Sequence, residues 1–352
     1  MTLSPNLRRQ RLRILLGQLG ADEDLLKRYL AGVDRETAEQ LRVDPAAVEA
    51  LLHAKATEGA APAEGLKSPL YQARLLCPLH APPKGFEGWF SLGHQRVEEN
   101  LFGVPLSLGG MDGYADVEYL LLEVQVCPDC LYASPFRQDF LKSGEASPRD
   151  PAVLAALAAP EALGERARLA GAHRGAFSDP ARGEEAGRAA CALALSCAGA
   201  ALEAGEASAA YRQAHVHLRL ARMDERAGDS AASRRRLGAG LEAYRRYRSV
   251  ELPSPILARV TRQIVALAAS LEDDALAAQH RAFLFDERTK ARRRLEEHDR
   301  ELAGARDADR DLILKKLEAR GQELQEAVAA YEKFFKQADE IWQDREQHRL
   351  KA

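Results

Sequence analysis

The sequence predicts a mainly α-helical protein with a small β domain, and three observations lead to this fold class. Ala, Leu, Glu and Arg dominate the composition, which is typical of helical proteins. Strand-like runs, with much of the glycine and proline, gather between residues 68 and 143. From residue 150 onward the pattern is almost continuously helical. We therefore expect a β domain that is followed by a helical C-terminal half.

Length, charge and cysteine content limit the class of protein. A chain of 352 residues can form two or three domains, each with its own core. The net charge of −3 gives no general attraction to nucleic acid or to anionic lipid. No run reaches the roughly 18 apolar residues of a membrane span, and the basic N-terminus lacks a signal-peptide cleavage site. Five cysteines are an odd number for a disulfide framework, so we expect a soluble cytoplasmic protein.

Residues 1–57 are predicted to form a helical N-terminal segment. Asp22, Asp34 and Asp44 stand at N-cap positions, where a short side chain accepts a backbone hydrogen bond. The stretch that follows, residues 58–67, is rich in Ala, Gly and Pro. We interpret it as a linker that marks a domain boundary.

The β domain is predicted over residues 68–143. Its strand-like runs are "YQARLLC", "FEGWFSLG" and "DVEYLLLEVQVC". The last of these is dense in Val, Leu and Tyr, and it reads as a strand that ends at Cys127. A short helix is expected directly afterwards, with Ser134 as its N-cap and Pro135 at its first position.

Two stretches of this domain carry pairs of side chains that bind metals. "LLCPLH" places Cys77 and His80 three residues apart, and "QVCPDCLYASPF" repeats that spacing with Cys127 and Cys130. The spacing allows both side chains of one tight turn to reach the same ion, and structural zinc takes four such ligands in a tetrahedron. We therefore predict one zinc ion on this Cys3His set. Four protein ligands leave no open position, which indicates structural rather than catalytic zinc.

Two other interpretations of these side chains stay open. "CPDC" alone is also the pattern of a redox dithiol, although no thioredoxin-like βαβ pattern surrounds it. Alternatively, Cys77 packs as a small hydrophobic side chain while His80 is simply exposed to solvent. We favour zinc because the two pairs match each other in spacing and in the proline after the first cysteine.

The stretch "LYQARLLCPLH…EVQVCPDCLYASPFRQDF" resembles a bacterial family of domains of unknown function. Members of this family carry a split zinc-ribbon-like core that ends in a strand, a C-P-x-C pair, a small aromatic segment and an Asp-Phe pair. In this chain the last elements are Tyr132, Ala133, Asp139 and Phe140. The resemblance is specific over residues 68–143. In the family a tetratricopeptide-like helical region often follows. Residues 150–270 of this chain resemble such a region in their general pattern.

Two residues depart from the family pattern. His80 replaces the second cysteine of the first pair, and Leu131 stands where glycine is usual after the second pair. Glycine would permit a positive φ at that point, so the substitution raises the question of how the turn is made. The Ala- and Arg-rich layout is similar to that of myxobacterial members that regulate cell polarity. This resemblance implies a Ras-like small GTPase and its roadblock-type activator as partners.

Residues 150–352 are predicted to form a tetratricopeptide-like array of antiparallel helices with a long C-terminal helix. Small and large apolar residues alternate on two stretches that are separated by "AGD". These residues are Ala214, Leu218, Ala221, Met223, Ala232, Leu237, Leu241 and Tyr244. The match is degenerate, because the usual Trp and Pro positions are not evident. The tail, residues 312–347, has apolar spacings mostly of three, four or seven and is expected to pack on the array or on a partner helix.

The remaining motifs are weaker. His215 and His217 are two residues apart, so they do not share a helix face and are not expected to form a metal pair. Cys191 and Cys197 lie in an Ala- and Leu-rich helix and are expected in the core. The sequence contains no phosphate-binding GxxxxGK[ST] loop, no GxSxG and no HExxH. We therefore expect no enzymatic activity.

The sequence thus favours a non-enzymatic cytoplasmic adaptor or regulator that binds other proteins. The resemblance implies a co-activator of GTP hydrolysis by a Ras-like small GTPase, acting in bacterial cell polarity and motility. The alternative is a zinc-ribbon nucleic-acid-binding module in transcription or RNA handling. That alternative requires a basic face, but residues 280–352 contain 17 Lys and Arg against 17 Asp and Glu, which favours a solvated helix over a phosphate-binding surface.

Overall fold

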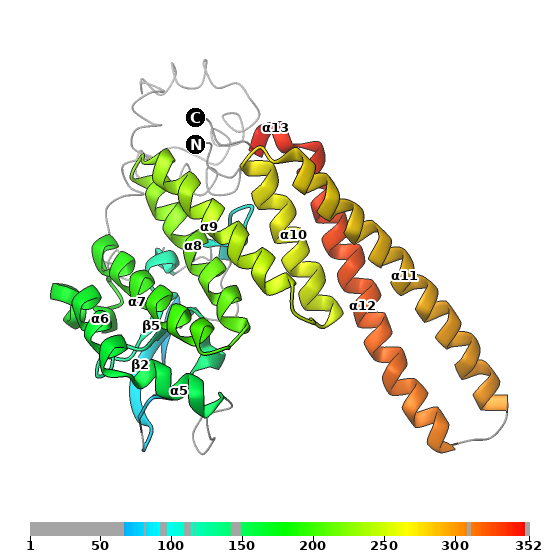
Figure 1. The fold of residues 1–352 in the computed structure, drawn as a ribbon, viewed down its shortest axis with the longest axis horizontal. Helices are drawn as coiled ribbons and strands as arrows, with labels where there is room; N and C mark the ends of the chain where they lie inside the picture. The colour runs from blue at the N-terminus through cyan, green and yellow to red at the C-terminus, as the bar shows by residue number, and fades with distance from the viewer. Residues whose placement is uncertain are drawn as a thin grey trace. The chain divides into compact units, whose positions relative to one another are not determined.

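The computed structural model describes residues 67–80, 82–91, 97–108, 114–115, 117–141, 149–307 and 311–348. The helical segment predicted at residues 1–57 and nearly all of the linker lie outside these ranges. The described part is mainly helical, with short strand pairs that precede the helices in the chain (Figure 1). At this level the predicted fold class is confirmed. The larger of two compact units comprises Gln72–Trp89, Glu99–Pro105 and Leu120–Ala352, and it contains the four predicted metal ligands and the helices that follow them.

The strands form three two-stranded sheets, and two of them frame the predicted metal ligands. β1 pairs with β2, β3 with β4, and β5 with β6; the last pair is antiparallel. The bounds are Leu70–Cys77 for β1, Lys84–Ser91 for β2, Val97–Glu99 for β3, Pro105–Leu108 for β4, Gln125–Val126 for β5 and Ala133–Ser134 for β6. The turn between β1 and β2 carries His80, and the turn between β5 and β6 carries Cys130. Each half of the predicted site therefore lies at the end of a strand pair.

The long strand expected before Cys127 is wrong except for its last residues, because only Gln125–Val126 is a strand. Upstream lies the 3-10 helix η1 (Tyr119–Leu121), and after it Leu122, Val124 and Gln125 are buried. The backbone carbonyls of this segment are satisfied by a buried arginine instead of a neighbouring strand. Arg182 donates to Leu121 O at 3.1 Å and to Val124 O at 2.8 Å. The hydrogen bonds from the buried Arg182 side chain thus take the place of those that a neighbouring strand would make.

The short helix expected after Ser134 is also wrong. Ser134 ends β6, and only one 3-10 turn follows, η2 (Arg137–Asp139). The N-cap position of this turn is Phe136, not Ser134. The Ser134 hydroxyl accepts the backbone N–H of Phe136 at 3.1 Å and donates to the Asp139 carboxylate.

Helices fill the rest of the described chain. Their bounds are Pro151–Ala158 for α5, Pro160–Ala170 for α6, Gly171–Ser178 for the 3-10 helix η3, Glu184–Glu203 for α7, Ser208–Arg226 for α8, Ser230–Arg248 for α9, Ser254–Ser270 for α10, Asp274–Asp307 for α11, Asp311–Gln343 for α12 and Arg345–His348 for α13. Local sequence explains several ends. Asp150 accepts the N–H of Ala152 at 2.7 Å, and Asp229 accepts that of Ala232 at 2.8 Å. Gly228 takes φ of 79° where α8 ends.

Consecutive helices from α7 to α10 pack against one another through one hydrophobic core. The apolar residues predicted for α8 and α9 are buried there, with Ala214, Leu218 and Tyr244 at most 1% exposed. Ala232 is the exception and is half-buried. Gly240 of α9 faces α8, and a Cβ at this position would lie 3.4 Å from Leu218 Cδ2, a close but ordinary contact.

Residues 120–133 share this core with the helices. Leu120, Val124 and Leu131 belong to the same buried cluster as residues of α7, α8, α9 and α10. At the closest approach, a Cβ on Gly187 of α7 would lie 2.8 Å from Leu121 Cδ2. The β5–β6 turn and the helices therefore stabilise one another directly.

The replacement Gly187→Ala is expected to lower the free energy of unfolding by about 1–3 kcal/mol, because the added methyl group must displace Leu121 in a packed core. Gly199→Ala in the same helix is the matched control. Its Cβ would meet only Gln213 Nε2, at 3.9 Å, so the helix propensity of alanine should dominate and stabilise by up to about 1 kcal/mol. Urea unfolding followed by circular dichroism measures both. Stabilisation by both variants would contradict the tight α7–Leu121 contact.

A second core joins α10 to the long hairpin α11–α12. Figure 1 shows α11 and α12 side by side along their length. Ala277, Leu284 and Ala291 recur every seven residues on α11 and are buried, which is the pattern of a coiled-coil seam. The tail therefore packs within the chain on α10 and α11. Among the described residues, no helix combines the length and apolar character needed to cross a membrane.

Candidate metal centre

The structure brings together the four predicted ligands, Cys77, His80, Cys127 and Cys130. Their ligand atoms all lie within 4.8 Å of one another. Cys77 Sγ lies 3.5 Å from Cys130 Sγ, and Cys127 Sγ lies 3.5 Å from His80 Nε2. Both short distances link one strand pair to the other. Two chain segments that are fifty residues apart thus converge on a single point.

Two of the six distances among these atoms approach the edges of a tetrahedral site. With Zn–S near 2.3 Å and Zn–N near 2.0 Å, those edges are about 3.8 Å between two sulfurs and about 3.5 Å between sulfur and nitrogen. The Cys127–His80 distance of 3.5 Å matches the second edge, and the Cys77–Cys130 distance of 3.5 Å is slightly shorter than the first. Cys77 and Cys127 are at most 1% exposed, whereas His80 and Cys130 are half-buried. A cation here would be largely shielded from water while lying close to the surface on the His80 side.

The three clustered thiols shift one another's pKa values. The pKa of Cys127 is lowered, mainly because hydrogen bonds from the Cys130 and Cys77 thiols stabilise its thiolate. The same hydrogen bond to Cys127 raises the pKa of Cys77 and brings that of Cys130 to about 11. Of the three thiols, Cys127 is therefore the one whose ionisation the neighbouring groups favour. A divalent cation would allow all three to ionise.

Leu131 stands where the family pattern has glycine, and the turn is made without one. It adopts φ of 60°, so the turn requires the left-handed conformation that glycine favours. Its N–H donates to Cys127 O at 2.9 Å, and the N–H of Cys127 donates to Tyr132 O at 2.9 Å, which closes the turn. The Leu131 side chain is 4% exposed and belongs to the shared core. Burial of this side chain offsets the strain of its backbone.

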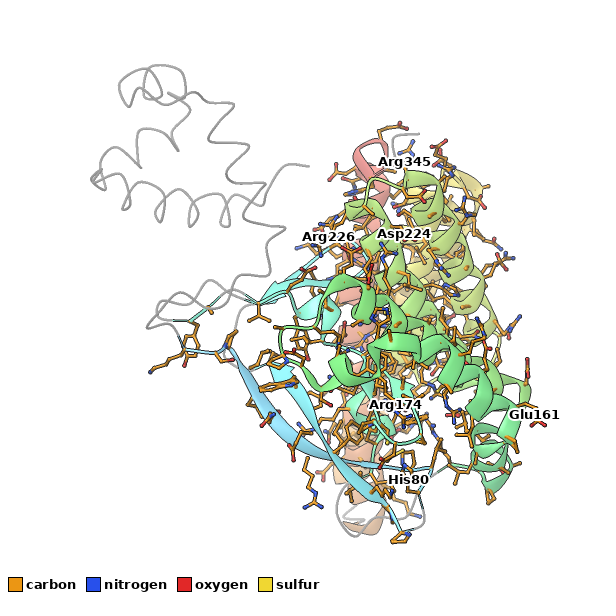
Figure 2. The ribbon with its side chains drawn as sticks, turned by 90° about the vertical axis from the view of Figure 1, so that its left-hand side faces the viewer. His80, Glu161, Arg174, Asp224, Arg226 and Arg345 are labelled. Carbon is orange, nitrogen blue, oxygen red and sulfur yellow. The ribbon has the colours of Figure 1, made fainter. Side chains whose placement is uncertain are left out.

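Two arginines hold the backbone of the second ligand pair. Arg166 of α6 is 0% exposed, and its Nε donates to Cys130 O at 3.0 Å while its Nη2 donates to Leu157 O at 2.9 Å. Arg174 of η3 donates to Pro128 O at 3.0 Å and to Asp129 O at 2.8 Å. Figure 2 labels Arg174 and His80, which lie in the same part of the molecule. Sequence reasoning missed both arginines, since neither differs in pattern from an ordinary helix residue.

The aromatic residues that carry the family resemblance pack behind the ligands. Tyr132 is 1% exposed, and its ring meets that of Phe140 edge to face at 5.5 Å between centroids. Phe140 in turn meets Phe86 of β2 at 5.4 Å. These contacts connect the β1–β2 and β5–β6 pairs, so the residues serve the packing of the site.

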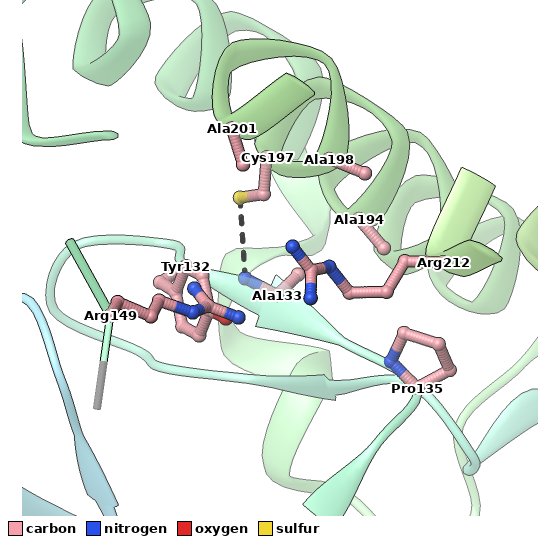
Figure 3. Close-up of a pocket in the computed structure, with 9 residues that line it drawn as sticks. All are labelled: Tyr132, Ala133, Pro135, Arg149, Ala194, Cys197, Ala198, Ala201 and Arg212. Carbon is pink, nitrogen blue, oxygen red and sulfur yellow. Dashed lines mark hydrogen bonds between the residues drawn. The ribbon is translucent and has the colours of Figure 1, made fainter. Parts of the chain in front are cut away.

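Asp139 belongs to a group of four charged residues between the turn and the helices. Its carboxylate lies 3.2 Å from Arg149 and 3.6 Å from Arg212, and Glu206 lies 2.7 Å from Arg212. Figure 3 shows Arg149 and Arg212 beside Tyr132, and Cys197 Sγ accepting the N–H of Ala133 at 3.5 Å. Two arginines balance two carboxylates here. We interpret this group as an ion-pair network that connects Asp139 to α8 and to the α7–α8 connection.

The other predicted residues lie away from the ligands. Cys191 and Cys197 are buried in the core as expected, and burial raises the pKa of Cys191 to about 12. His215 is part of an aromatic cluster, 5.0 Å from the Phe136 ring and 4.4 Å from the Tyr211 ring. Its pKa is lowered because burial disfavours the charged form. His217 does not take part in the ring contacts of His215, as expected for two helix residues that are two positions apart.

The free energy of unfolding is expected to fall as the pH drops from 6.5 toward 4. Burial lowers the pKa of His217 and of His280 to about 4, so below pH 6.5 the unfolded chain binds more protons than the folded one. At pH 5 each contributes up to about 2 kcal/mol of lost stability. Urea unfolding at pH 7.5 and pH 5 measures the loss. His280→Gln should reduce it, and an unchanged difference would contradict this origin.

Comparisons with protein-family models, curated proteins and solved structures found no match to this chain. The resemblance to the bacterial family therefore depends on the quoted residues alone. What stands independently is a Cys3His cluster that is close enough to hold a metal ion, in a mainly helical protein.

Proposed function

We propose that this chain is a non-enzymatic adaptor whose β segments are stabilised by one structural zinc ion. The observation that carries the zinc assignment is the convergence of the Cys77, His80, Cys127 and Cys130 ligand atoms within 4.8 Å of one another, a donor set that zinc prefers. When bound, zinc would supply structural cross-linking of two strand pairs. Four protein ligands leave no position for a substrate, and this supports a structural rather than a catalytic role.

The helical part is proposed to be the protein-binding part, as a tetratricopeptide-like array. Support comes from consecutive helices α7, α8, α9 and α10 that pack in order through short connections. Helix-pair arrays bury a continuous core and leave extended surfaces on which peptides and helices bind. The hollow of Figure 3, in contrast, is crossed by the Arg149 and Arg212 side chains, and these are engaged with carboxylates. Extended helical surfaces suit a macromolecular partner better than a small substrate.

The narrower proposal is co-activation of GTP hydrolysis by a Ras-like small GTPase together with its roadblock-type activator, in bacterial cell polarity and motility. The family resemblance supports it, and so does the lack of a phosphate-binding loop in the sequence. The physical route would be bridging. A chain that contacts both proteins raises their effective local concentration or stabilises the switch segments of the GTPase in the hydrolytic geometry.

A hydrolysis assay with each of the three proteins alone, in pairs and together tests the narrower proposal. We expect no hydrolysis by this chain alone and faster hydrolysis only when all three are present. Equal rates with and without this chain, at saturating concentrations, would exclude co-activation. Salt-sensitive binding to arbitrary duplex DNA by the same preparation would then favour the zinc-ribbon nucleic-acid module.

A further inference from the structure

One face of the α11–α12 hairpin carries exposed aromatic and arginine side chains. Arg281, Phe285, Arg288 and Arg292 follow one another on α11 at helical spacings of four, three and four. Phe285 is 47% exposed, the largest value among the exposed large hydrophobic residues of the described chain. The buried contacts of the hairpin with α10 use other positions, such as Leu284. The row through Phe285 is therefore a surface distinct from the α10 contact.

Residues of α12 form the other side of this surface. We call the whole surface the Phe285 face; it consists of Arg281, Phe285, Arg288, Arg292, Glu332, Phe335 and Asp339. The two phenylalanine rings lie 5.6 Å apart between centroids. The Arg288 guanidinium lies over both, 4.9 Å from the centroid of Phe285 and 4.3 Å from that of Phe335. At the two ends, Arg281 Nε donates to Asp339 at 2.7 Å and Arg292 Nε donates to Glu332 at 2.7 Å.

Arg288 differs from the two flanking arginines in its charge balance. Arg281 and Arg292 each contact a carboxylate, whereas Arg288 pairs with no carboxylate among the described residues. Its Nε is buried without a hydrogen-bond acceptor in that part of the chain. The centre of the Phe285 face is therefore a cation without a carboxylate partner among the described residues, and it lies over two aromatic rings.

We propose that the Phe285 face binds an acidic amphipathic helix of a partner protein. A carboxylate of that helix would pair with Arg288, and apolar side chains one turn away would cover Phe285 and Phe335. Arginine and aromatic side chains are the residues on which protein interfaces most often depend. The inference rests on the adaptor function proposed above, and it specifies which surface binds and what it selects.

Charge argues against two other occupants. An isologous contact with a second copy would bring the centre of one Phe285 face to the centre of the other, and would place Arg288 against Arg288. A nucleic-acid backbone would meet the carboxylates of Glu332 and Asp339 alongside the arginines. The carboxylates of an acidic amphipathic helix would pair with Arg288, and its leucines would cover the exposed Phe285 ring.

The test uses the full chain and a labelled helical peptide of about 18 residues, with leucines at i, i+3, i+4 and i+7 and glutamates beside them. A control peptide carries lysine in place of every glutamate. Fluorescence anisotropy should show binding of the acidic peptide only. Arg288→Glu should weaken it about tenfold or more, because a like charge replaces the pairing cation. Arg293→Glu, the same change at a side chain that is 79% exposed on the same helix, should leave it within about twofold.

Three outcomes would overturn the proposal: no binding by the wild-type chain, equal loss from Arg288→Glu and Arg293→Glu, or equal binding of both peptides. Concentration-dependent self-association that Arg288→Glu abolishes would assign the face to a second copy instead. Duplex DNA binding that Arg288→Glu abolishes would assign it to phosphate. Circular dichroism of each variant confirms that the helices are intact.

The GTPase assay separates this inference from the function on which it rests. Stimulated hydrolysis that persists undiminished in Arg288→Glu would reject the Phe285 face and leave the co-activator proposal standing. Specific peptide binding without any stimulation would support the face and reject the GTPase as the partner.

Discussion

Replacement of Cys127 by Ser is expected to abolish stoichiometric zinc binding and to lower the free energy of unfolding by several kcal/mol. Structural zinc contributes on the order of 10 kcal/mol in small peptide sites, because the binding energy is released only on folding. Cys127 is 1% exposed and closes the turn through its backbone contacts with Leu131 and Tyr132. Metal analysis and thermal unfolding of the purified protein measure the two effects.

The loss is expected to spread beyond the strand pairs. Arg166 and Arg174 donate to the carbonyls of residues 128–130, and Leu131 lies in the same core as α7 and α8. Cys191→Ala is the matched control, because it removes a buried thiol of that core without touching a ligand. It should retain one zinc ion per chain. Wild-type protein with well under one zinc per chain, or a Cys127→Ser variant as stable as Cys191→Ala, would contradict a structural zinc centre.

His80 gives the same centre a more selective test. His80→Cys keeps a soft ligand at the position and restores the cysteine of the family pattern, so it should still bind one zinc ion. His80→Ala removes the fourth ligand and should bind zinc more weakly. If both variants bind zinc as tightly as the wild type, the three cysteines hold the metal and His80 is not a ligand.

The cluster of Cys77, His80, Cys127 and Cys130 could be predicted from the sequence because its signal is local. Two ligands three residues apart, with proline after the first, define a turn whatever the rest of the chain does. The N-caps Asp150 and Asp229 and the buried face of α8 are local signals of the same kind. In each case neighbouring residues decide the conformation.

What could not be predicted depends on residues far apart in the chain. "DVEYLLLEVQVC" resembles a buried strand because its apolar residues are consecutive, but Arg182, about sixty positions later, satisfies its carbonyls. Arg166 and Arg174 act on the metal turn from about 40 residues away. An arginine in a helix gives no sign of whether its guanidinium faces solvent or a distant carbonyl.

A further long-range contact, between Arg219 and Glu123, supports the second large prediction. Replacement of Arg219 by Met is expected to lower the free energy of unfolding by about 3 kcal/mol. Arg219 of α8 is 2% exposed and contacts Glu123, whose side chain is 17% exposed, with Nε–Oε2 at 2.6 Å. Burial alone would lower the pKa of Arg219, but the Glu123 carboxylate outweighs it and raises that pKa. Removal of the cation therefore leaves a largely buried carboxylate without its partner, which is the costly way to break such a pair.

The double replacement Arg219→Met with Glu123→Gln should recover much of this loss, since no charge is then left buried. Arg168→Met, which breaks the exposed pair of Arg168 with Glu165, is the matched control and should change stability little. Guanidinium unfolding of the four proteins, the wild type included, completes the comparison. If Arg219→Met costs no more than Arg168→Met, the ion pair does not connect the β5 segment to α8. If the double variant is less stable than Arg219→Met alone, the cost lies in lost packing of the long arginine side chain and not in the stranded charge.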